Sequence, residues 1–319
     1  MTCTSLNWGS KLLIAALLIA GLSADSLTAA ETLKVFVLAG QSNMQGHGKV
    51  KADPKANGGQ GSLEWLVKES PKKADFKHLV TDSGDWVSRD DVQIWYLGRQ
   101  GKLTAGYGAS EEMMGPELGF GHVVGNAIDE PVLLVKLAWG GKSLGQDFRP
   151  PSSGGTVGPY YQEIITQTKT VLKDLPKLFP EYASHQAELV GFGWHQGWND
   201  RINQAFNDEY EKNLANLVRD LRKDLSAPNM KFVVAETGMT GPTETHPRAL
   251  SLMKAQAAVA EYEEFRGNVA FVGTRDFYRP KEESPSGQGY HWNSNAETYY
   301  LIGDGMGHAM LKLLKPASK

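Results

Sequence analysis

The stretch LKVFVLAGQSNMQGHG, residues 33–48, decides the fold of this 319-residue chain. Its first half is a nearly continuous apolar run rich in β-branched residues, which is typical of a strand buried on both faces of a parallel sheet. Gly40 ends the run, and the polar segment Gln41–Asn43 follows where a strand turns into a helix. A serine at this turn, Ser42, lies beside a helix N-terminus whose N–H groups favour a developing anion. Two interpretations stay open here: a nucleophile, or an ordinary N-cap serine.

Short apolar strands and amphipathic helices alternate through most of the remaining chain. We expect strands over 132–139, 187–194, 230–235 and 269–272, and helices over 115–128, 160–175, 204–225, 248–265 and 296–314. Several of the strands run into glycine-containing turns. The alternation predicts a three-layer α/β/α sandwich around a central parallel sheet, with crossover helices on both faces. Functional residues are then expected at the carboxyl ends of the strands.

Residues 1–30 have the pattern of a secretory signal peptide. Lys11 precedes the apolar run LLIAALLIAGL at 12–22, and small residues follow at 27–30. An uncleaved membrane anchor is the alternative, although the run is short for a membrane span. The only cysteine, Cys3, precedes the apolar run and is badly placed for lipoprotein cleavage. We therefore predict a periplasmic or secreted protein without disulfides and without stable membrane association after signal cleavage.

After this segment, residues 31–319 are predicted to form one domain with a loop-rich insertion at about 47–112. Within the insertion, WVSRDDVQIWYL at 86–97 has β-type composition and predicts one or two strands at the sheet edge or in a small excursion. Four aromatic residues of the insertion either line a sugar-binding surface or belong to the core, and both interpretations stay open. They are Trp65, Trp86, Trp95 and Tyr107.

Composition and charge exclude several kinds of partner. The chain is 41% hydrophobic and 22% charged, with a formal net charge of -3 and a pI near 6.3. No basic run is suited to nucleic acid or to a membrane surface, so neither partner is predicted. His122 and His308 lack histidine or carboxylate partners at ligand spacing, so we predict no zinc site.

Reactive and hydrogen-bonding residues gather at the predicted strand ends and in the last loop. Acyl transfer requires a hydroxyl nucleophile, a base that takes its proton near neutral pH, and donors aimed at the tetrahedral oxyanion. Ser42 suits the nucleophile and His291 the base. The oxyanion donors would be the backbone N–H of Ser42, an N–H of the Gly140–Gly141 turn and the side-chain amide of Gln196.

Four motifs make a family resemblance specific. GQSNM at 40–44, WGGKS at 139–143, WHQG at 194–197 and the segment starting HWNSNAE at 291 resemble the four blocks of the SGNH hydrolase superfamily. They are most similar to its sialate O-acetylesterase and acetylxylan esterase branch, carbohydrate esterase family six. The resemblance implies a flavodoxin-like three-layer fold and removal of acetyl groups from carbohydrates without metal or organic cofactor. It also implies nucleophile Ser42 and base His291, with oxyanion donors Ser42, Gly140 or Gly141, and Gln196.

The chain departs from this family where an acid usually orients the base. Gln288 stands three residues before His291, where many relatives have aspartate, and Trp198 stands where some have glutamate. The remaining candidates are Asp200, Asp276, the Gln288 side-chain oxygen and a backbone carbonyl. We favour Asp200, because it shares a strand-end loop with the third motif. An N-cap of the 204–225 helix is an equally good interpretation of Asp200.

These residues favour a secreted serine esterase that removes O-acetyl groups from an acetylated glycan, either a polysaccharide or a sialate. Two alternatives stay open: a catalytically impaired carbohydrate-binding protein on the same fold, and an esterase for a non-acetyl ester. The missing acid motivates the first alternative. The sequence predicts neither the glycan nor the oligomeric state.

Overall fold

The computed structural model describes residues 1–5 and 31–315. The chain divides into two units, Met1–Ala30 and Glu31–Lys319, and the predicted signal peptide lies outside the described residues except for its first five. The described helices include none that is both long and apolar enough to span a bilayer. All helices and strands described below belong to the second unit.

A seven-stranded sheet forms the centre of this unit. In spatial order its strands are β4 (Arg99–Lys102), β3 (Val92–Tyr96), β6 (Val132–Ala138), β1 (Thr32–Gly40), β7 (Gln186–His195), β8 (Lys231–Ala235) and β9 (Val269–Val272). All neighbours pair in parallel except β4, which pairs antiparallel with β3 at the edge. The predicted α/β fold with a central parallel sheet is thereby confirmed, and β4 adds an antiparallel strand at its edge.

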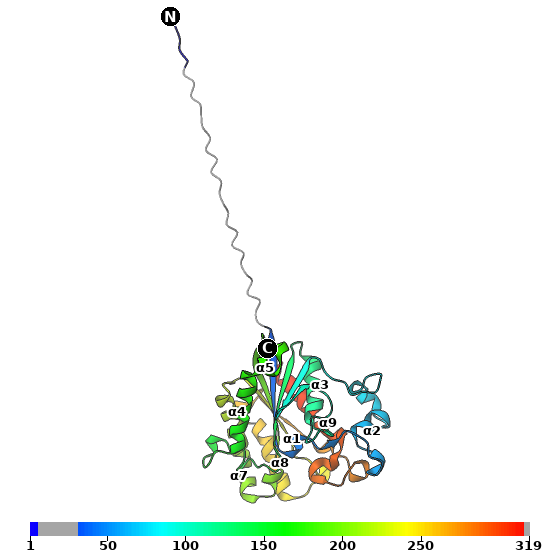
Figure 1. The fold of residues 1–319 in the computed structure, drawn as a ribbon. Helices are drawn as coiled ribbons and strands as arrows, with labels where there is room; N and C mark the ends of the chain where they lie inside the picture. Colours follow the sequence, from blue (N-terminus) through cyan, green and yellow to red (C-terminus); the bar gives the residue numbers. More distant parts are fainter. Residues whose placement is uncertain (6–30, 316–319) are drawn as a thin grey trace. The chain divides into compact units, whose positions relative to one another are not determined.

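Two helical layers cover the sheet because successive side chains of a buried strand point to opposite faces. Val35 and Val37 of β1 belong to one apolar core, while Phe36 and Leu38 belong to the other. The first core includes α4 (Pro159–Lys173), α7 (Gln204–Asp224) and α8 (Pro247–Ala260), and the second includes α3 (Pro116–Ala127) and α9 (Ala296–Leu314). Figure 1 shows α4 and α7 on one side of the sheet and α3 and α9 on the other.

Helices α3 and α9 pack closely because glycines bring their backbones together. A Cβ on Gly303 would lie 1.9 Å from the carbonyl oxygen of Pro116, and one on Gly119 would lie 2.2 Å from that of Tyr300. No side chain fits at either position. The glycines interrupting the predicted 115–128 helix therefore serve helix packing.

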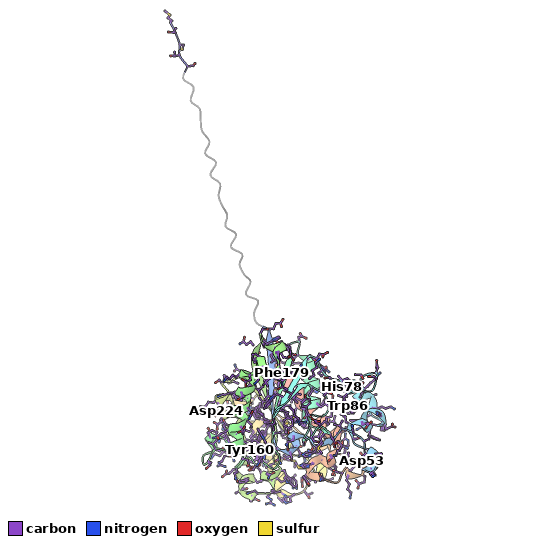
Figure 2. All side chains as sticks on the ribbon, viewed as in Figure 1. Asp53, His78, Trp86, Tyr160, Phe179 and Asp224 are labelled. Atoms are coloured by element: carbon purple, nitrogen blue, oxygen red, sulfur yellow. The ribbon has the colours of Figure 1, made fainter. Side chains whose placement is uncertain are left out.

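The insertion at 47–112 contains more regular structure than the loops predicted there. Helix α2 (Leu63–Lys68) begins at the N-cap Ser62, whose Oγ accepts the N–H of Trp65 at 3.2 Å. A two-stranded ribbon pairs β2 (Gly48–Lys49) with β5 (Met113–Met114). The predicted 86–97 strand begins only at Val92, while Trp86 forms an isolated bridge with Val80. Figure 2 labels Trp86, His78 and Asp53 in this region, across the sheet from Tyr160 and Asp224.

Short helical segments complete the connections. They are α1 (Ser42–Gln45), α5 (Leu175–Leu178), α6 (Trp198–Arg201) and the 3-10 turns η1 (Asn57–Gly59), η2 (Lys73–Leu79), η3 (Pro151–Ser153), η4 (Pro180–Tyr182), η5 (Gly241–Thr243), η6 (Glu263–Phe265), η7 (Arg275–Phe277), η8 (Lys281–Glu283) and η9 (Gly289–Ser294).

A fully buried ion pair lies between the sheet and α1. The Lys136 ammonium of β6 donates to Glu117 Oε2 at 2.6 Å and to the carbonyl oxygens of Gln45 and Tyr107, each at 2.7 Å. Its three hydrogens therefore each meet an oxygen. Burial lowers the pKa of Lys136 to about 8, although Glu117 opposes the shift. The pair ties β6 and α3 to the last residue of α1.

Breaking this pair tests its contribution to stability. Glu117→Leu leaves the Lys136 charge buried without its counter-ion, so we expect the free energy of unfolding to fall by about 3–5 kcal/mol in urea titrations. The double variant Glu117→Leu/Lys136→Met removes both charges. Its free energy of unfolding should fall by less than the sum of the losses in Glu117→Leu and in Lys136→Met alone. Strictly additive losses would show that the two side chains do not stabilise each other.

Candidate active site

The candidate site lies where three neighbouring strands end. Strand β1 lies between β6 and β7, and Gly40, its last residue, is in register with both Ala138 and His195. The turns after all three strands therefore leave the sheet at the same level. A Cβ on Gly40 would lie 2.1 Å from the carbonyl oxygen of His195, and its φ of +155° also favours glycine. Glycine is thus required for this close approach.

Ser42 is the first residue of α1 and is 8% exposed. The preceding residue, Gln41, holds the turn against the end of β7. Its side-chain oxygen accepts the backbone N–H of Gly197 at 3.1 Å and the side-chain amide of Gln196 at 3.2 Å. The turn is consequently positioned by side-chain hydrogen bonds as well as by the sheet.

The Gly140–Gly141 turn after β6 lies beside Ser42. A Cβ built on Gly140 would be 3.9 Å from Ser42 Cβ, and both glycines are exposed. Within the part of the chain that the structure describes, the backbone N–H groups of Ser42, Gly140 and Gly141 donate no hydrogen bond. Three uncommitted donors therefore lie near the Ser42 hydroxyl, as an oxyanion hole requires.

Gln196 is buried and its amide is engaged with protein atoms. The amide nitrogen lies 2.6 Å from Asp200 Oδ2, 2.9 Å from the carbonyl oxygen of Lys142 and 3.2 Å from Gln41 Oε1. Its side-chain oxygen accepts from the Tyr210 hydroxyl at 3.1 Å. Three acceptors thus share two amide hydrogens, so Gln196 links the three turns. Donation to an oxyanion would require Gln196 to exchange one of these bonds.

Asp200 lies on the Gln196 side of the site. Its two carboxylate oxygens accept the backbone N–H groups of Leu144 at 2.9 Å and Gly145 at 2.8 Å, besides the amide of Gln196. Burial raises the pKa of Asp200 to about 6, although these hydrogen bonds oppose the shift. Asp200 therefore holds the segment that follows the Gly140–Gly141 turn.

Neither role expected of Asp200 matches these contacts. The described residues include no hydrogen bond between Asp200 and the ring of His291, so Asp200 does not orient the ring by direct contact. The N-cap of α7 is Asn203, whose Oδ1 accepts the N–H of Phe206 at 3.2 Å. The His291 ring also makes no hydrogen bond with the other expected partners among the described residues. Asp276 is exposed, and the backbone carbonyl of Gln288 accepts the backbone N–H of His291 at 2.8 Å.

His291 belongs to η9, a loop that is tied to the residue after Ser42. Asn43 donates its side-chain amide to the carbonyl oxygen of Tyr290 at 3.0 Å and accepts the Tyr299 hydroxyl at 2.7 Å. No hydrogen bond joins Ser42 Oγ to the His291 ring among the described residues, and such bonds are often long without substrate. The structure thus brings the Ser42 turn and the His291 loop together.

Aromatic rings, rather than a carboxylate, surround the His291 imidazole. The His47 ring stacks on it with centroids 3.8 Å apart and planes within 6°. The Tyr290 ring packs edge-on at 4.5 Å, and Trp198 lies 5.7 Å from Tyr290. Packing therefore restricts the orientation of His291, and Trp198 contributes through Tyr290. Sequence reasoning missed His47, whose only signal is its place in the 33–48 stretch.

Both stacked imidazoles favour the neutral state. Burial lowers the pKa of His291 from its ordinary value of 6.5. Burial also lowers the pKa of His47 to about 4, helped by the neighbouring charges of His291, Lys136 and Lys49. A neutral imidazole is the form that accepts a proton, so burial keeps the His291 ring in the proton-accepting form to lower pH than in a free histidine.

The chain matches one described family. A family model described as "Carbohydrate esterase, sialic acid-specific acetylesterase" matches residues 32–312. No curated protein matches the chain at a significant level.

Two solved structures are similar in fold. A protein from Arabidopsis thaliana has a TM-score of 0.58 and 17% identity, with 87% of this chain and 97% of that chain covered. A carbohydrate acetylesterase from Xanthomonas citri has a TM-score of 0.45 and 12% identity, with 77% of this chain and 50% of that chain covered. At this identity the Arabidopsis protein supports the fold alone.

The stacked pair predicts a dependence of His291 on its neighbour. In His47→Ala the His291 ring is opened to water, which stabilises the imidazolium, so its pKa should rise toward 6.5. His47→Phe keeps a flat ring over His291 and should preserve the low pKa. Titration of the imidazole signals by nuclear magnetic resonance measures both, and an unchanged midpoint in His47→Ala would contradict the account.

Proposed function

The chain belongs to the carbohydrate esterase, sialic acid-specific acetylesterase family, and from this premise we propose that it hydrolyses O-acetyl esters of carbohydrates through an acetyl-enzyme. The observation that carries the proposal is the group of uncommitted N–H donors around Ser42, with His291 tethered beside the same turn. Nucleophile, oxyanion donors and base are the three parts that acyl transfer requires.

In the first half-reaction Ser42 Oγ attacks the acetyl carbonyl carbon while His291 takes the hydroxyl proton. The carbonyl oxygen becomes an oxyanion, which accepts hydrogen bonds from the N–H groups of Ser42 and Gly140 or Gly141. Each such donor lowers the barrier by about 3–4 kcal/mol in a dry site. The tetrahedral intermediate then expels the sugar oxygen, which takes the proton from His291.

The second half-reaction removes the acetyl group from Ser42. His291 takes a proton from water, which attacks the acetyl carbonyl, and the same donors hold the second oxyanion. Expulsion of Ser42 Oγ, which recovers the proton, releases acetate. No carboxylate contacts the His291 ring in the described part of the chain, so its imidazolium is stabilised less than in a serine triad. We propose that stacking on His47 compensates by holding the ring in position.

A carbohydrate-binding protein that has lost turnover is the second candidate. The observation that favours it is the lack of a carboxylate beside His291 among the described residues. The esterase is preferred because Ser42, His291 and the backbone donors are all present, and loss of the third residue costs a serine hydrolase less rate than loss of its serine or histidine.

We further propose that the protein is exported. Support comes only from the N-terminal sequence, in which Lys11 precedes the apolar run at 12–22 and small residues follow. An acetylated glycan outside the cytoplasm would then be the substrate.

Replacing the nucleophile tests the proposed reaction. Ser42→Ala should lower acetate release from acetylated xylan and from 4-nitrophenyl acetate by about three orders of magnitude or more, because no covalent intermediate forms. The circular dichroism spectrum should stay unchanged. Retained activity in Ser42→Ala would overturn the mechanism, and a preference of the wild type for long acyl chains would overturn the acetyl specificity.

The contacts of Asp200 predict a loss of rate without a change in the pKa of His291. Asn at this position cannot accept all three hydrogen bonds, so the segment after Gly141 should shift and kcat/KM should fall by about ten- to a hundredfold. The His291 imidazole signals, titrated by nuclear magnetic resonance, should keep their midpoint. A downward shift of that midpoint in Asp200→Asn would instead show that the carboxylate stabilises the His291 imidazolium.

A further inference from the structure

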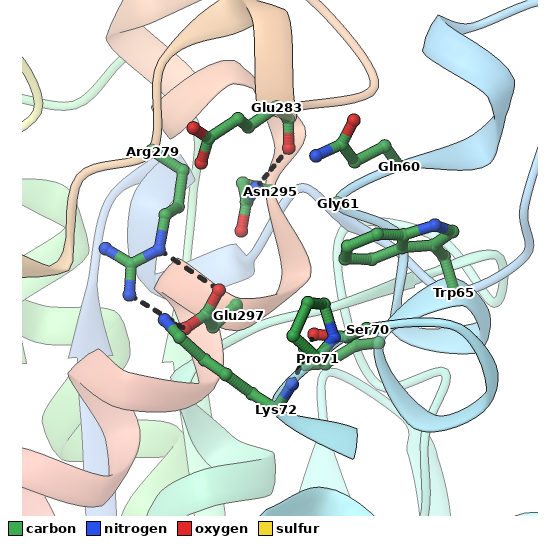
Figure 3. Close-up of a pocket in the computed structure, with 11 residues that line it drawn as sticks. Gln60, Gly61, Trp65, Ser70, Pro71, Lys72, Arg279, Glu283, Asn295 and Glu297 are labelled. Atoms are coloured by element: carbon green, nitrogen blue, oxygen red, sulfur yellow. Dashed lines mark hydrogen bonds and ion pairs between the residues drawn. The ribbon is translucent and has the colours of Figure 1, made fainter.

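A cavity of about 270 Å³ lies between the insertion and the start of α9. Figure 3 shows Trp65 of α2 on one side of this cavity and Arg279 and Glu283 on the other, with Lys72 along the bottom. The Trp65 indole is half-buried and extends toward the middle of the cavity. None of the roles described above for catalysis uses these residues.

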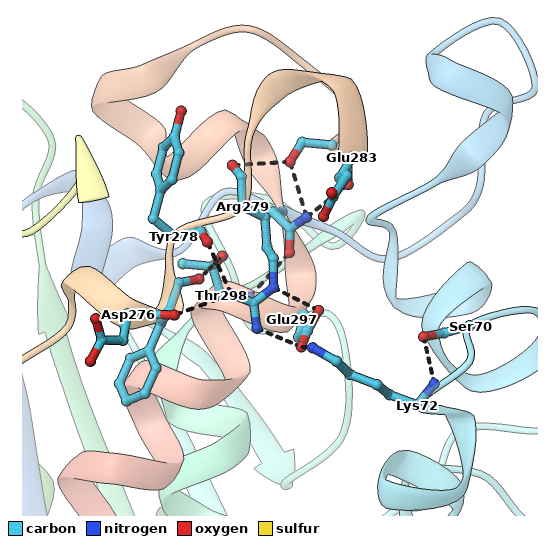
Figure 4. A network of polar contacts seen from close by, with 11 residues as sticks. Ser70, Lys72, Asp276, Tyr278, Arg279, Glu283, Glu297 and Thr298 are labelled. Atoms are coloured by element: carbon cyan, nitrogen blue, oxygen red, sulfur yellow. Dashed lines mark hydrogen bonds and ion pairs between the residues drawn. The ribbon is translucent and has the colours of Figure 1, made fainter. Parts of the chain in front are cut away.

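An ion-pair network makes the wall opposite Trp65 rigid, and both cations that the structure describes at this cavity, Lys72 and Arg279, are paired. Arg279 donates to the Glu297 carboxylate from Nε at 3.0 Å and from Nη2 at 2.7 Å, and Lys72 Nζ donates to the same group at 2.7 Å (Figure 4). Arg279 Nη1 donates to the carbonyl oxygens of Asp276 and Tyr278. The Glu297 side chain is 12% exposed and that of Arg279 is 17% exposed. The Lys72 and Arg279 side chains are thus both paired with the Glu297 carboxylate.

Three polar groups on the cavity lining make no hydrogen bond with any described residue. They are the Trp65 indole N–H, the Gln60 amide and the Glu283 carboxylate. The cavity thus has an aromatic ring and the Gln60 amide on one side and the Glu283 carboxylate on the opposite wall. A pyranose matches this arrangement, because its ring presents an apolar C–H face for stacking and hydroxyl groups at its rim.

The cavity lies within reach of the catalytic loop. Asn295, which lines the cavity, follows His291 by four residues, and four residues span at most about 14 Å. The backbone N–H of Ala296 donates to the carbonyl oxygen of Gly61 at 2.8 Å, which joins the insertion to the start of α9. A short oligosaccharide can therefore reach from this cavity toward the Ser42 turn.

We propose that this cavity is a glycan subsite that binds a neutral pyranose unit of the chain whose acetylated unit is at Ser42. The inference rests on the proposed function, because the proposed reaction is what makes a glycan the ligand of this protein. Trp65 stacks on the sugar ring, and Gln60 and Glu283 bind hydroxyl groups. A uronate or sialate carboxylate is disfavoured, because Lys72 and Arg279 are already paired with Glu297 and Glu283 is anionic.

Direct binding tests the subsite without turnover. The Ser42→Ala protein is titrated with xylohexaose, cellohexaose and mannohexaose, and with oligogalacturonate, by calorimetry and tryptophan fluorescence. At least one neutral oligosaccharide should bind and quench fluorescence, with oligogalacturonate at least tenfold weaker. Adding Trp65→Ala should weaken binding at least tenfold, and Trp65→Phe should restore part of the affinity. The matched control is Trp86→Ala, which removes another half-buried tryptophan of the insertion and should leave binding unchanged.

A kinetic comparison separates this inference from the proposed function. With acetylated xylo-oligosaccharides, Trp65→Ala should raise KM at least tenfold, and the effect should fall on KM rather than on kcat. No neutral binding, tighter oligogalacturonate binding, or full affinity in a folded Trp65→Ala protein would overturn the subsite. Trp65-dependent binding without acetate release by the wild type would overturn the esterase and leave the subsite standing.

Discussion

The register of β1 between β6 and β7 is the constraint on which the site depends. Because Gly40 is level with both Ala138 and His195, three turns leave the sheet side by side. The site is therefore built from the short segments that directly follow these strands, namely Ser42, the Gly140–Gly141 turn and residues 196–200. A hydrogen bond from the Gln196 amide to the Gln41 side chain holds two of these turns together. The Lys136 ammonium donates to the carbonyl oxygen of Gln45, the last residue of α1. The backbone thus supplies the proposed oxyanion donors, and the hydrogen bonds of these side chains hold the turns in place.

The proposed base, His291, is held in a different way from the proposed nucleophile, Ser42. In a serine triad a carboxylate accepts the imidazole N–H, which fixes the ring and stabilises its charged form. Here packing between His47 and Tyr290 fixes the His291 ring, and burial disfavours the charged form. Such a base gives up stabilisation of the imidazolium and remains unprotonated at lower pH. Trp198 belongs to the same aromatic cluster, because its ring lies 5.7 Å from that of Tyr290.

The elements that sequence predicted well are the long, periodic ones. The predicted 187–194 strand and 204–225 helix differ from β7 and α7 by at most one residue at each end. Helix α2 was missed because six residues are too short for a helical period to show. The contacts of Asp200 and the stacking of His47 on His291 were not predictable, because both join residues far apart in sequence whose chemistry allows several roles. The motif residues identified the turns, and only the three-dimensional contacts showed which atoms remain free.

Trapping the acetyl-enzyme would show whether Ser42 is the nucleophile. The wild-type protein is mixed with 4-nitrophenyl acetate, quenched in acid within the first turnover, digested and analysed by mass spectrometry. We predict one acetyl group on the peptide that contains Ser42, and its loss at longer times as acetate accumulates. Acetate release without acetylation of Ser42, or acetylation at another residue that turns over at the same rate, would contradict this prediction.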